Sequence, residues 1–449
     1  MMKLIPGSLT RWSCFLSCFC IFSFFLLSCK DHKDLPGKQH DPSQPVKLTT
    51  FQPLEGGVRT QVLLDGSNFG TDTSKIKVYF NHAKAPVIGT NGDRLYVTVP
   101  RLPGHDCVVS VVVDGDSVFY PVTFTYNTTA TVTTVTGNGT KSNVAGTLAE
   151  AEVYARYVAV DDEGNVFASF RDGGDGLFRI NEQQNIVAMV MDSKAAGITP
   201  NAVTVDPQTN LVACAPDGIK EQYFTFNPTE VWAPREQTIK YTTAELNAIK
   251  DGDRYKNFMS FCTYDSCIYT RNRDGTVTRI HRGTNEPDVF PGVTPPGGTN
   301  YGQAFDTRYP WRLYFSFASN APGYQYCIAY LDVRDLEPNK IKLVKVTQAG
   351  AHGFKDGPVA TALFYNPRQL AFDQDGNMFV ADYSNHCIRM ISTDGIVSTV
   401  AGQPETSGYA DGGPDVSLFN APWGVAVDNN GVVYISDYGN ARIRKLVIE

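Results

Sequence analysis

Two stretches near the end of the chain decide the fold. The first reads NPRQLAFD at 366–373 and continues as GNMFVAD at 376–382. The second reads APWGVAVD at 421–428 and continues as GVVYISD at 431–437. Their equivalent aspartates, Asp373 and Asp428, are 55 residues apart. Because self-similarity at a fixed period marks a repeat architecture, this pair of copies fixes how the second part of the chain must be read.

Each copy contains several short strands. NHCIR at 385–389 and NARIR at 440–444 follow the stretches above, and the first copy then reaches VSTVAG at 397–402. Short runs of β-branched and aromatic residues between Gly, Asn and Asp are typical of strands, so each unit has four. Weaker copies precede them at 156–170, 201–215, 257–272 and 301–317. The sequence therefore predicts six four-stranded units.

The two ends of the repeat region complement each other. The last unit stops at Glu449 after its third strand, whereas ATVTTVTG at 130–137 matches the fourth-strand sequence VSTVAG. We expect the early strand to complete the last unit, since pairing the two ends of a ring removes its free edges. Four-stranded units of this period, with NHCI at 385–388, resemble the NHL-type β-propeller. The resemblance implies a six-bladed propeller over residues 130–449.

Residues 46–126 form a separate unit of short alternating strands. Turn signals such as Asp65-Gly66, Asn91-Gly92 and Asp114-Gly115 separate the strands and predict a β-sandwich. The stretch DGSNFG at 65–70 and the pair Val99-Pro100 resemble the immunoglobulin-like IPT/TIG domain. That family commonly serves as a spacer or docking module, so we expect a spacer here. The fold class is all-β, a sandwich followed by a propeller.

The N-terminus has the features of an export signal. Lys3 and Arg11 precede an apolar run at 14–27 that is too short to span a bilayer comfortably. LLSC at 26–29 resembles a lipobox, which implies removal of residues 1–28 and acylation of Cys29; ordinary cleavage leaving a free cysteine is the alternative. KDHKD at 30–34 resembles the surface-export signal of lipoproteins in glycan-harvesting gut anaerobes. We expect a flexible tether at 29–45 and an outer-membrane lipoprotein facing the cell exterior.

Charge and cysteine content exclude several classes of protein. The formal charge of −7 becomes −9 when Lys3 and Arg11 leave with the signal peptide, which disfavours nucleic acid as a partner. The cysteines after Cys29 are scattered and lack zinc-ligand spacing. Cys262 and Cys267 flank a predicted hairpin turn, so a disulfide between them remains open.

The repeat also predicts where a binding site lies. The innermost strand of each blade lines the channel, so residues at one repeat position form a ring near its mouth. The position of Trp423 gives a ring of aromatic, guanidinium and amide side chains, namely Arg156, Asn201, Asn257, Tyr301, Arg368 and Trp423. The position of Asp437 adds Phe170, Asn272, Phe317, Asp382 and Asp437. Aromatic faces stack on sugars and polar groups bind hydroxyls, so this composition suits a neutral or mildly acidic glycan; the alternative is that these side chains only satisfy neighbouring backbone groups.

Other repeated residues have structural explanations. Asp161, Asp206, Asp306, Asp373 and Asp428 could form a metal cage, but caps of the turn between the first two strands are the favoured interpretation. The loops from Asp356 to Phe364 and from Asp411 to Phe419 connect blades, and we expect each Phe to enter the core. His386, at the signature position of the family, is expected to be structural.

No catalytic constellation is apparent, and no cofactor is expected. The histidines show neither HExxH nor metal-ligand spacing and no GxSxG occurs, although a calcium ion in the channel stays open. The sequence therefore predicts a non-catalytic lipoprotein that binds polysaccharide or oligosaccharide for a neighbouring outer-membrane importer, similar to accessory proteins of starch-utilisation-type systems. The alternatives are a metal-dependent lyase or hydrolase and a protein- or peptide-binding scaffold.

Overall fold

The computed structural model describes most of the chain after residue 36. The described ranges are 37–81, 83–101, 106–127, 129–171, 174, 176–192, 199–217, 221–249, 258–272, 274–295, 300–336 and 340–449. The predicted signal peptide, the lipidation site Cys29 and the predicted site residue Asn257 lie outside these ranges. Strands dominate throughout, and the helical elements are short: η1 Thr73–Lys75, η2 Pro228–Glu230, α2 Thr243–Ala248, η3 Val333–Asp335, η4 Tyr383–Asn385 and η5 Tyr438–Asn440.

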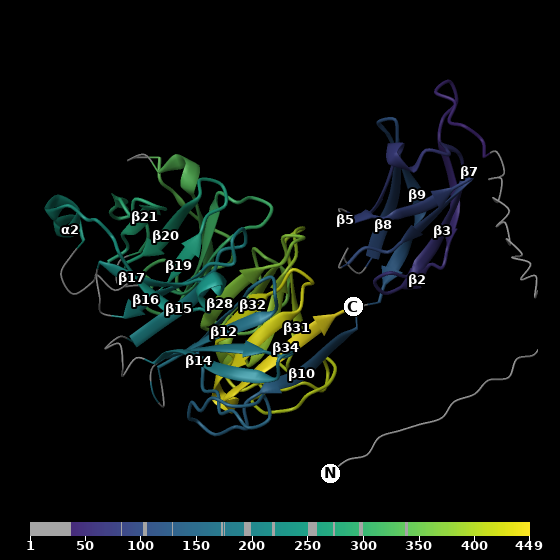
Figure 1. Ribbon diagram of the computed structural model, residues 1–449. Helices are drawn as coiled ribbons and strands as arrows, with labels where there is room; N and C mark the ends of the chain where they lie inside the picture. The colour runs from purple at the N-terminus through teal and green to yellow at the C-terminus, as the bar shows by residue number, and fades with distance from the viewer. Residues whose placement is uncertain are drawn as a thin grey trace, which may run out of the picture.

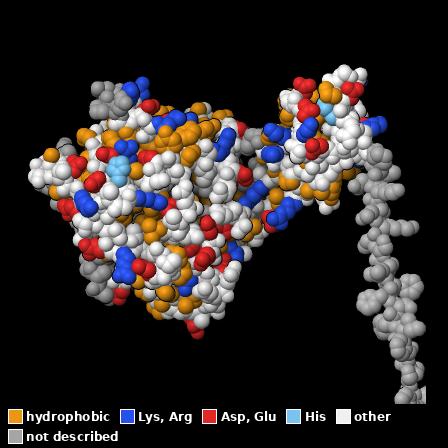
Figure 2. Space-filling view, turned by 45° about the horizontal axis from the view of Figure 1, so that its top comes forward, with side chains coloured by type: hydrophobic (Ala, Val, Ile, Leu, Met, Phe, Trp, Pro, Cys, Tyr) orange, Lys and Arg blue, Asp and Glu red, His pale blue; other side chains and the backbone are white. Residues whose placement is uncertain are grey.

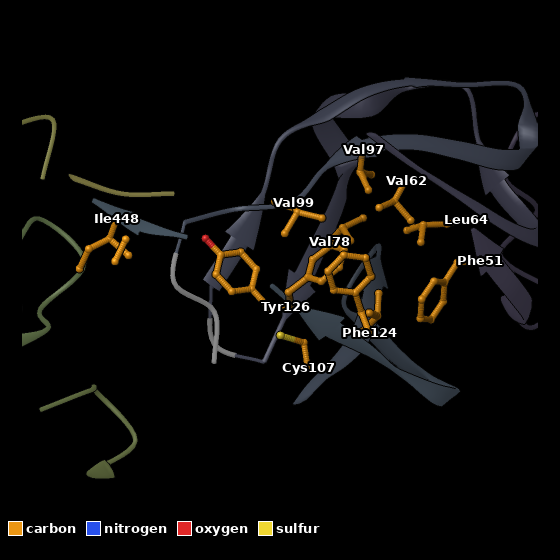
Figure 3. Packing of buried hydrophobic residues seen from close by; sticks show 14 of the residues in the cluster. Phe51, Val62, Leu64, Val78, Val97, Val99, Cys107, Phe124, Tyr126 and Ile448 are labelled. Atoms are coloured by element: carbon orange, nitrogen blue, oxygen red, sulfur yellow. The ribbon is translucent and has the colours of Figure 1, made fainter. Parts of the chain in front are cut away.

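The first part of the chain is a two-sheet sandwich. One sheet has the order β1-β3-β7-β6 and the other β2-β9-β8-β4-β5. The strands are β1 Lys47–Gln52, β2 Glu55–Gly56, β3 Gln61–Gly70, β4 Ile76–Phe80, β5 Ala83–Ala85, β6 Val87–Thr90, β7 Gly92–Thr98, β8 Asp106–Val113 and β9 Asp116–Tyr126. Figure 3 shows Phe51, Leu64 and Phe124 packed between the two sheets. The alternation of buried and exposed residues along β4 and β7 is the pattern that two packed sheets require.

Residues 37–45, which the sequence assigns to the tether, lie against the sandwich. The His40 Nδ1 is 2.8 Å from the Asn68 carbonyl oxygen, and Asn68 Nδ2 donates to the carbonyl of Gln44 at 2.7 Å. Lys38 N donates to the Asn91 carbonyl at 3.1 Å. The expectation of a flexible tether does not fit this part, because turn residues of the sandwich supply backbone and side-chain partners for it. Residues 29–36 lie outside the described ranges.

After the sandwich, the described residues form six further sheets. Five of them have four strands and the fifth in chain order carries an extra two-residue strand. In that order the sheets are β11-β12-β13-β14, β15-β16-β17-β18, β19-β20-β21-β22, β23-β24-β25-β26, β27-β31-β30-β29-β28 and β10-β34-β33-β32. We number these blades 1 to 6.

The strand bounds follow the repeat read from the sequence. They are β10 Ala130–Thr136, β11 Tyr157–Val160, β12 Asn165–Phe170, β13 Gly176–Asn181, β14 Ile186–Asp192, β15 Thr199–Val205, β16 Val212–Asp217, β17 Gln222–Phe226, β18 Pro234–Thr238, β19 Met259–Phe261, β20 Cys267–Arg271, β21 Val277–His281, β22 Pro287–Phe290, β23 Asn300–Phe305, β24 Arg312–Phe317, β25 Ile328–Asp332, β26 Leu343–Lys345, β27 Gly357–Pro358, β28 Pro367–Phe372, β29 Met378–Asp382, β30 Cys387–Ile391, β31 Ile396–Ala401, β32 Gly424–Val427, β33 Val433–Asp437 and β34 Arg442–Ile448.

The six sheets close into a ring. Each innermost strand contacts the innermost strand of the next blade, in the order β11, β15, β19, β23, β28, β32, and β32 in turn contacts β11. Figure 1 shows two of these neighbours, β28 and β32, side by side. The predicted latch is confirmed, because β10 pairs antiparallel with β34 from Ala130 opposite Ile448 onward. Thr134 of β10 bonds Asp411 as Thr399 of blade 5 bonds Asp356, so the latch strand occupies the place of a regular fourth strand. The all-β prediction, a sandwich followed by a propeller, is confirmed.

A short connection joins the sandwich to the propeller. Thr129 and Glu449 exchange two backbone hydrogen bonds of 2.7 Å where the chain enters the propeller. From the sandwich, Arg101 Nη2 donates to the carbonyls of Gly431 at 2.6 Å and Ile448 at 3.3 Å. In Figure 3, Tyr126 lies on the side of the sandwich that faces Ile448. These contacts lie at the turn after β32, so the sandwich is attached at the end of the propeller opposite Trp423.

Two further expectations concern cysteines and the membrane. All described cysteines are free and buried. Cys262 directs its thiol to the Pro310 carbonyl at 3.4 Å and Cys267 directs its thiol to the Asp265 carbonyl at 3.5 Å, so the disulfide alternative is not realised. Within the described ranges, every helix is too short or too polar to span a bilayer.

Candidate functional site

One end of the central channel is closed by side chains that cross it. They come from the repeat position that directly follows that of Trp423. This position holds a large residue in blades 1, 3 and 5 (Tyr157, Phe258, Gln369) and a small one in blades 2, 4 and 6 (Ala202, Gly302, Gly424). Tyr157 meets the Phe258 ring at 5.1 Å and the Trp423 ring at 6.0 Å. The Gln369 amide exchanges bonds of 2.7 and 3.1 Å with the backbone of Val158. The contacts of Tyr157 with Phe258 and of Gln369 with Val158 join non-adjacent blades, so the side chains form a floor across the channel.

The small residues are required by the close approach of neighbouring inner strands. A Cβ on Gly302 would lie 2.5 Å from the Arg368 carbonyl oxygen, and one on Gly424 would lie 2.7 Å from the Arg156 carbonyl oxygen. Real side-chain atoms do not approach backbone oxygens so closely. The alternation of large and small residues therefore lets three side chains fill a space that six could not.

Above the floor, Arg368 lies among aromatic rings. Its guanidinium carbon is 3.4 Å from the centre of the Tyr301 ring, 4.0 Å from that of Trp423 and 4.4 Å from that of Tyr383. Trp423 contacts both tyrosines edge to face, at 5.6 and 5.4 Å. Arg368 and Trp423 are almost enclosed, with 8% and 7% of their surface exposed, whereas Tyr301 and Tyr383 are half-buried. The structure thus brings together three predicted residues, Tyr301, Arg368 and Trp423.

The row of rings continues across blades 6 and 1. Tyr438 meets Trp423 at 5.1 Å and stacks on Tyr154 at 4.6 Å with an interplanar angle of 18°. Arg156, a predicted site residue, lies 4.8 Å from the Trp423 ring. Asn201 is also at this end but is buried. We call the half-buried rings Tyr154, Tyr301, Tyr383 and Tyr438, with Arg156, Arg368 and Trp423, the mouth cluster.

A second group of rings lies beside the mouth cluster. Tyr365 is 4.5 Å from His352 and 5.8 Å from Tyr326. Its carbonyl accepts a hydrogen bond from Ser384 N, the residue after Tyr383, at 3.0 Å. Aromatic side chains therefore extend in a strip along this end of the propeller. The visible face in Figure 2 likewise shows hydrophobic side chains in small patches among polar ones.

Tyr383 and Tyr438 are positioned by a repeated buried network. Each lies in a short 3-10 helix, η4 or η5, directly after the aspartate that ends the second strand. Asp437 accepts from Asn420 N at 2.9 Å, Asn440 Nδ2 at 2.8 Å and Arg444 Nη1 at 2.8 Å. Asp382 has the equivalent partners in blade 5. Arg444 also bonds Asp411 and the carbonyls of Leu418 and Ala410, and Arg389 repeats this pattern with Asp356, Leu363 and Lys355.

The second ring predicted from the sequence is therefore not a ligand surface in this structure. Asp382 and Asp437 are fully buried. Burial raises the pKa of each to about 6, while the Arg and Asn donors act in the opposite direction. Phe170 packs on Phe178 and Phe317 packs in the core of blade 4. Asn272 is also buried. These side chains lie at the end of the second strand of their blades and point into the blades. In blades 5 and 6 the residue that follows, Tyr383 or Tyr438, reaches the mouth.

Sequence reasoning therefore missed Tyr154, Tyr383 and Tyr438. The signal for two of them was present, since DYSN at 382–385 and DYGN at 437–440 repeat the tyrosine at one position. Tyr154 precedes β11 and carries no repeat signal. Its place beside Tyr438 follows from ring closure, which brings blade 1 against blade 6.

Below the floor, the channel holds a cavity of about 220 Å³. Apolar side chains of the inner strands line it together with the turn aspartates Asp161, Asp306 and Asp428. These aspartates cap turns as predicted: Asp161 accepts from the backbone N–H groups of Glu163 and Asn165, and Asp428 accepts from those of Asn430 and Val432. Over the ranges that the structure describes, no three metal-ligating side chains gather at one point.

The other structural expectations are also confirmed. Phe364 and Phe419 are buried at 1% and 0% exposure. His386 Nδ1 accepts a hydrogen bond of 3.0 Å from Ala421 N, which joins blade 5 to the loop entering blade 6. Burial lowers the pKa of His386, consistent with a neutral ring in this contact.

Comparisons with known families agree with this architecture. Residues 45–126 match the IPT/TIG domain, and residues 364–389 and 419–446 match the NHL repeat. The chain thus carries an IPT/TIG domain and NHL repeats. A curated relative, NHL repeat-containing protein 2 of Gallus gallus, is 33% identical over 107 residues. This match covers 24% of the chain and only 14% of that relative.

Solved structures resemble the whole described architecture. A structural genomics protein of unknown function from Bacteroides thetaiotaomicron has a TM-score of 0.72 at 24% identity, covering 92% of this chain and 100% of that one. An auxiliary nutrient binding protein from the same organism has a TM-score of 0.58 at 23% identity, covering 92% and 99%. One from Bacteroides ovatus has a TM-score of 0.57 at 20% identity, covering 92% and 100%. At these identities the comparison establishes a shared fold.

Proposed function

We propose that this chain is a non-catalytic accessory protein that binds a polysaccharide or oligosaccharide at the mouth cluster and holds it for a neighbouring outer-membrane importer. The observation that carries the proposal is the row of half-buried rings, Tyr154, Tyr438, Tyr383 and Tyr301, across one end of the propeller. Flat aromatic faces bind the apolar faces of sugar rings.

The rings are fixed before any ligand arrives. Asp382 and Asp437 hold the two 3-10 helices through buried ion pairs, and Trp423 packs against both tyrosines that these helices carry. A pre-ordered surface loses little conformational entropy when a ligand binds. This arrangement therefore favours capture of an extended chain, whose individual contacts are weak.

The placement of the domains supports the same function. The sandwich joins the propeller through Arg101 at the turn after β32, whereas the mouth cluster lies at the start of the same inner strand. A lipid on Cys29, upstream of the sandwich, would then leave the mouth cluster facing away from the anchored end. The fold neighbours named auxiliary nutrient binding proteins support a nutrient-binding accessory role.

Affinity electrophoresis tests the proposal. The mature polypeptide without acyl chains would be run through gels containing a panel of polysaccharides, beside Tyr438→Ala. We expect at least one polysaccharide to retard the chain, and the substitution to weaken binding about tenfold, for a loss of about 1.4 kcal/mol. Tyr264→Ala is the matched control, since this tyrosine is 52% exposed in the β19–β20 turn at the opposite end. Unretarded migration in every gel, or equal weakening by both substitutions, would refute the proposal.

A further inference from the structure

Arg368 carries an enclosed positive charge that has no counter-ion among the described residues. Its Nε and Nη1 atoms are buried, and in the part of the chain that the structure describes they meet no hydrogen-bond acceptor. The side chain is 8% exposed and its nearest neighbours are the rings of Tyr301, Trp423 and Tyr383. What stabilises the charge is the electron-rich faces of these rings, each worth roughly 0.5–2 kcal/mol.

Two buried arginines of blades 5 and 6 have a different environment. Arg389 and Arg444 are fully buried, and each forms ion pairs with two carboxylates, one of them also fully buried. An enclosed charge that lacks such a partner costs several kcal/mol. The same blades thus supply carboxylates to the arginines that build the fold, but none to the arginine at the mouth.

A second arginine lies beside the same aromatic cluster. Arg156 lies 4.8 Å from the centre of the Trp423 ring, which Arg368 approaches to 4.0 Å. Burial raises the pKa of the Tyr157 hydroxyl beneath them, and the charged side chains that act on it, Arg368 and Arg156, both lower that pKa.

We propose that the mouth cluster recognises an acidic sugar, with the guanidinium of Arg368 donating to the carboxylate of a uronic acid residue while its pyranose ring lies on the neighbouring tyrosines. This inference rests on the proposed function and names the class of glycan. A guanidinium is weakly hydrated and matches a carboxylate in geometry, so it suits a site enclosed by rings. The carboxylate supplies the counter-ion that the fold omits, and its contact with Arg368 becomes stronger because water is excluded by the same rings.

A purely structural role for Arg368 makes a different prediction. In that case the guanidinium only fills the space between Tyr301, Trp423 and Tyr383. Its replacement by an apolar side chain of similar length would then leave discrimination between charged and neutral sugars unchanged. Arg368→Met separates the two roles, because it keeps the volume and removes the charge.

The test compares polyuronates with the same polymers after chemical reduction of their carboxylates. Binding of polygalacturonate, alginate and hyaluronan, and of each reduced form, would be measured by calorimetry on the mature polypeptide. We expect at least one polyuronate to bind at least tenfold more tightly than its reduced form, with a preference that declines as salt rises. Arg368→Met should abolish the preference, and Arg368→Lys should restore part of it. Arg308→Met is the matched control, since Arg308 is an exposed arginine 5.6 Å from the Tyr309 ring in the turn after β23.

The outcomes separate this inference from the proposed function. Tight binding of neutral polysaccharides without any preference for a polyuronate would overturn the acidic-sugar inference and leave the proposed function standing. A preference that survives in Arg368→Met would also overturn it. If dextran sulfate bound and no polyuronate did, the assignment of a sugar carboxylate as the group that Arg368 recognises would be refuted. Failure of all charged and neutral polymers would refute both. Thermal melting of each variant shows whether it is folded, and Arg368→Lys keeps the test valid should Arg368→Met unfold.

Discussion

Replacing Asp437 by Asn should destabilise the propeller although it changes only one atom. Asp437 and Arg444 are both fully buried, with Arg444 Nη1 2.8 Å from the carboxylate. An Asn at this position can accept from Asn420 N with its oxygen, but its NH2 group then faces the Asn440 and Arg444 donors. Arg444 would lose one of its two anionic partners in a buried site.

The magnitude follows from what remains around Arg444. Breaking a buried ion pair from one side costs about 3–5 kcal/mol. Because Asp411 and two backbone carbonyls still hold the guanidinium, the loss should be at the lower end, about 3 kcal/mol. At roughly 2 °C per kcal/mol for a domain of this size, the melting transition of the propeller should fall by about 6 °C.

Differential scanning calorimetry measures this change and separates the two domains where they melt apart. Asp415→Asn, the same substitution at an exposed aspartate of the neighbouring loop, should leave the transition in place. Asp382→Asn should repeat the effect, since blade 5 has the same network. An unchanged propeller transition in Asp437→Asn would show that the buried pair does not stabilise the fold as argued.

Two further predictions concern packing and pH. Gly424→Ala should cost about 1–3 kcal/mol, because its Cβ would meet the Arg156 carbonyl at 2.7 Å and Gln369 Oε1 at 2.9 Å. Gly89→Ala, with open space around it, should be neutral, and urea unfolding followed by circular dichroism, which reports on both domains, compares the two variants. For His386, whose pKa is lowered by burial, the unfolded chain takes up the proton first as pH falls below about 6.5, so stability should decline from there. Urea midpoints at pH 7.5 and 5.5 should differ less in His386→Gln than in the native chain, and an identical difference would contradict the neutral-ring assignment.

The sequence predicted the architecture because repetition and alternation are visible in it. Two copies with equivalent aspartates 55 residues apart fixed the frame, and the fourth-strand sequence at 130–137 predicted the latch that β10 forms with β34. The role of Asp161 followed from the local turn sequence, that of Phe364 from the repeated loop, and that of His386 from the resemblance to NHL repeats. Each of these features depends on residues that are close in the chain or repeated in it.

The site was predicted in part. Arg156, Tyr301, Arg368 and Trp423 do converge at one end of the channel, as their shared repeat position predicted. The second ring was displaced by one residue, so it named Asp382 and Asp437 instead of Tyr383 and Tyr438. A strand that ends in a 3-10 turn reverses which side chain faces the channel, and spacing alone does not show where that turn begins.

What the sequence by itself determined is the repeat, the strand count of each unit and the chemical types gathered at the mouth. Only the tertiary structure decided which of these side chains are enclosed and which cation lacks a counter-ion. The physical reason is ring closure, since it brings residues of blades 1, 5 and 6 together across more than two hundred residues of chain, as in the contact of Val158 with Gln369. Alternating large and small side chains then close the floor. Arg368 is left above it among aromatic rings, and no carboxylate of the described ranges pairs with its charge.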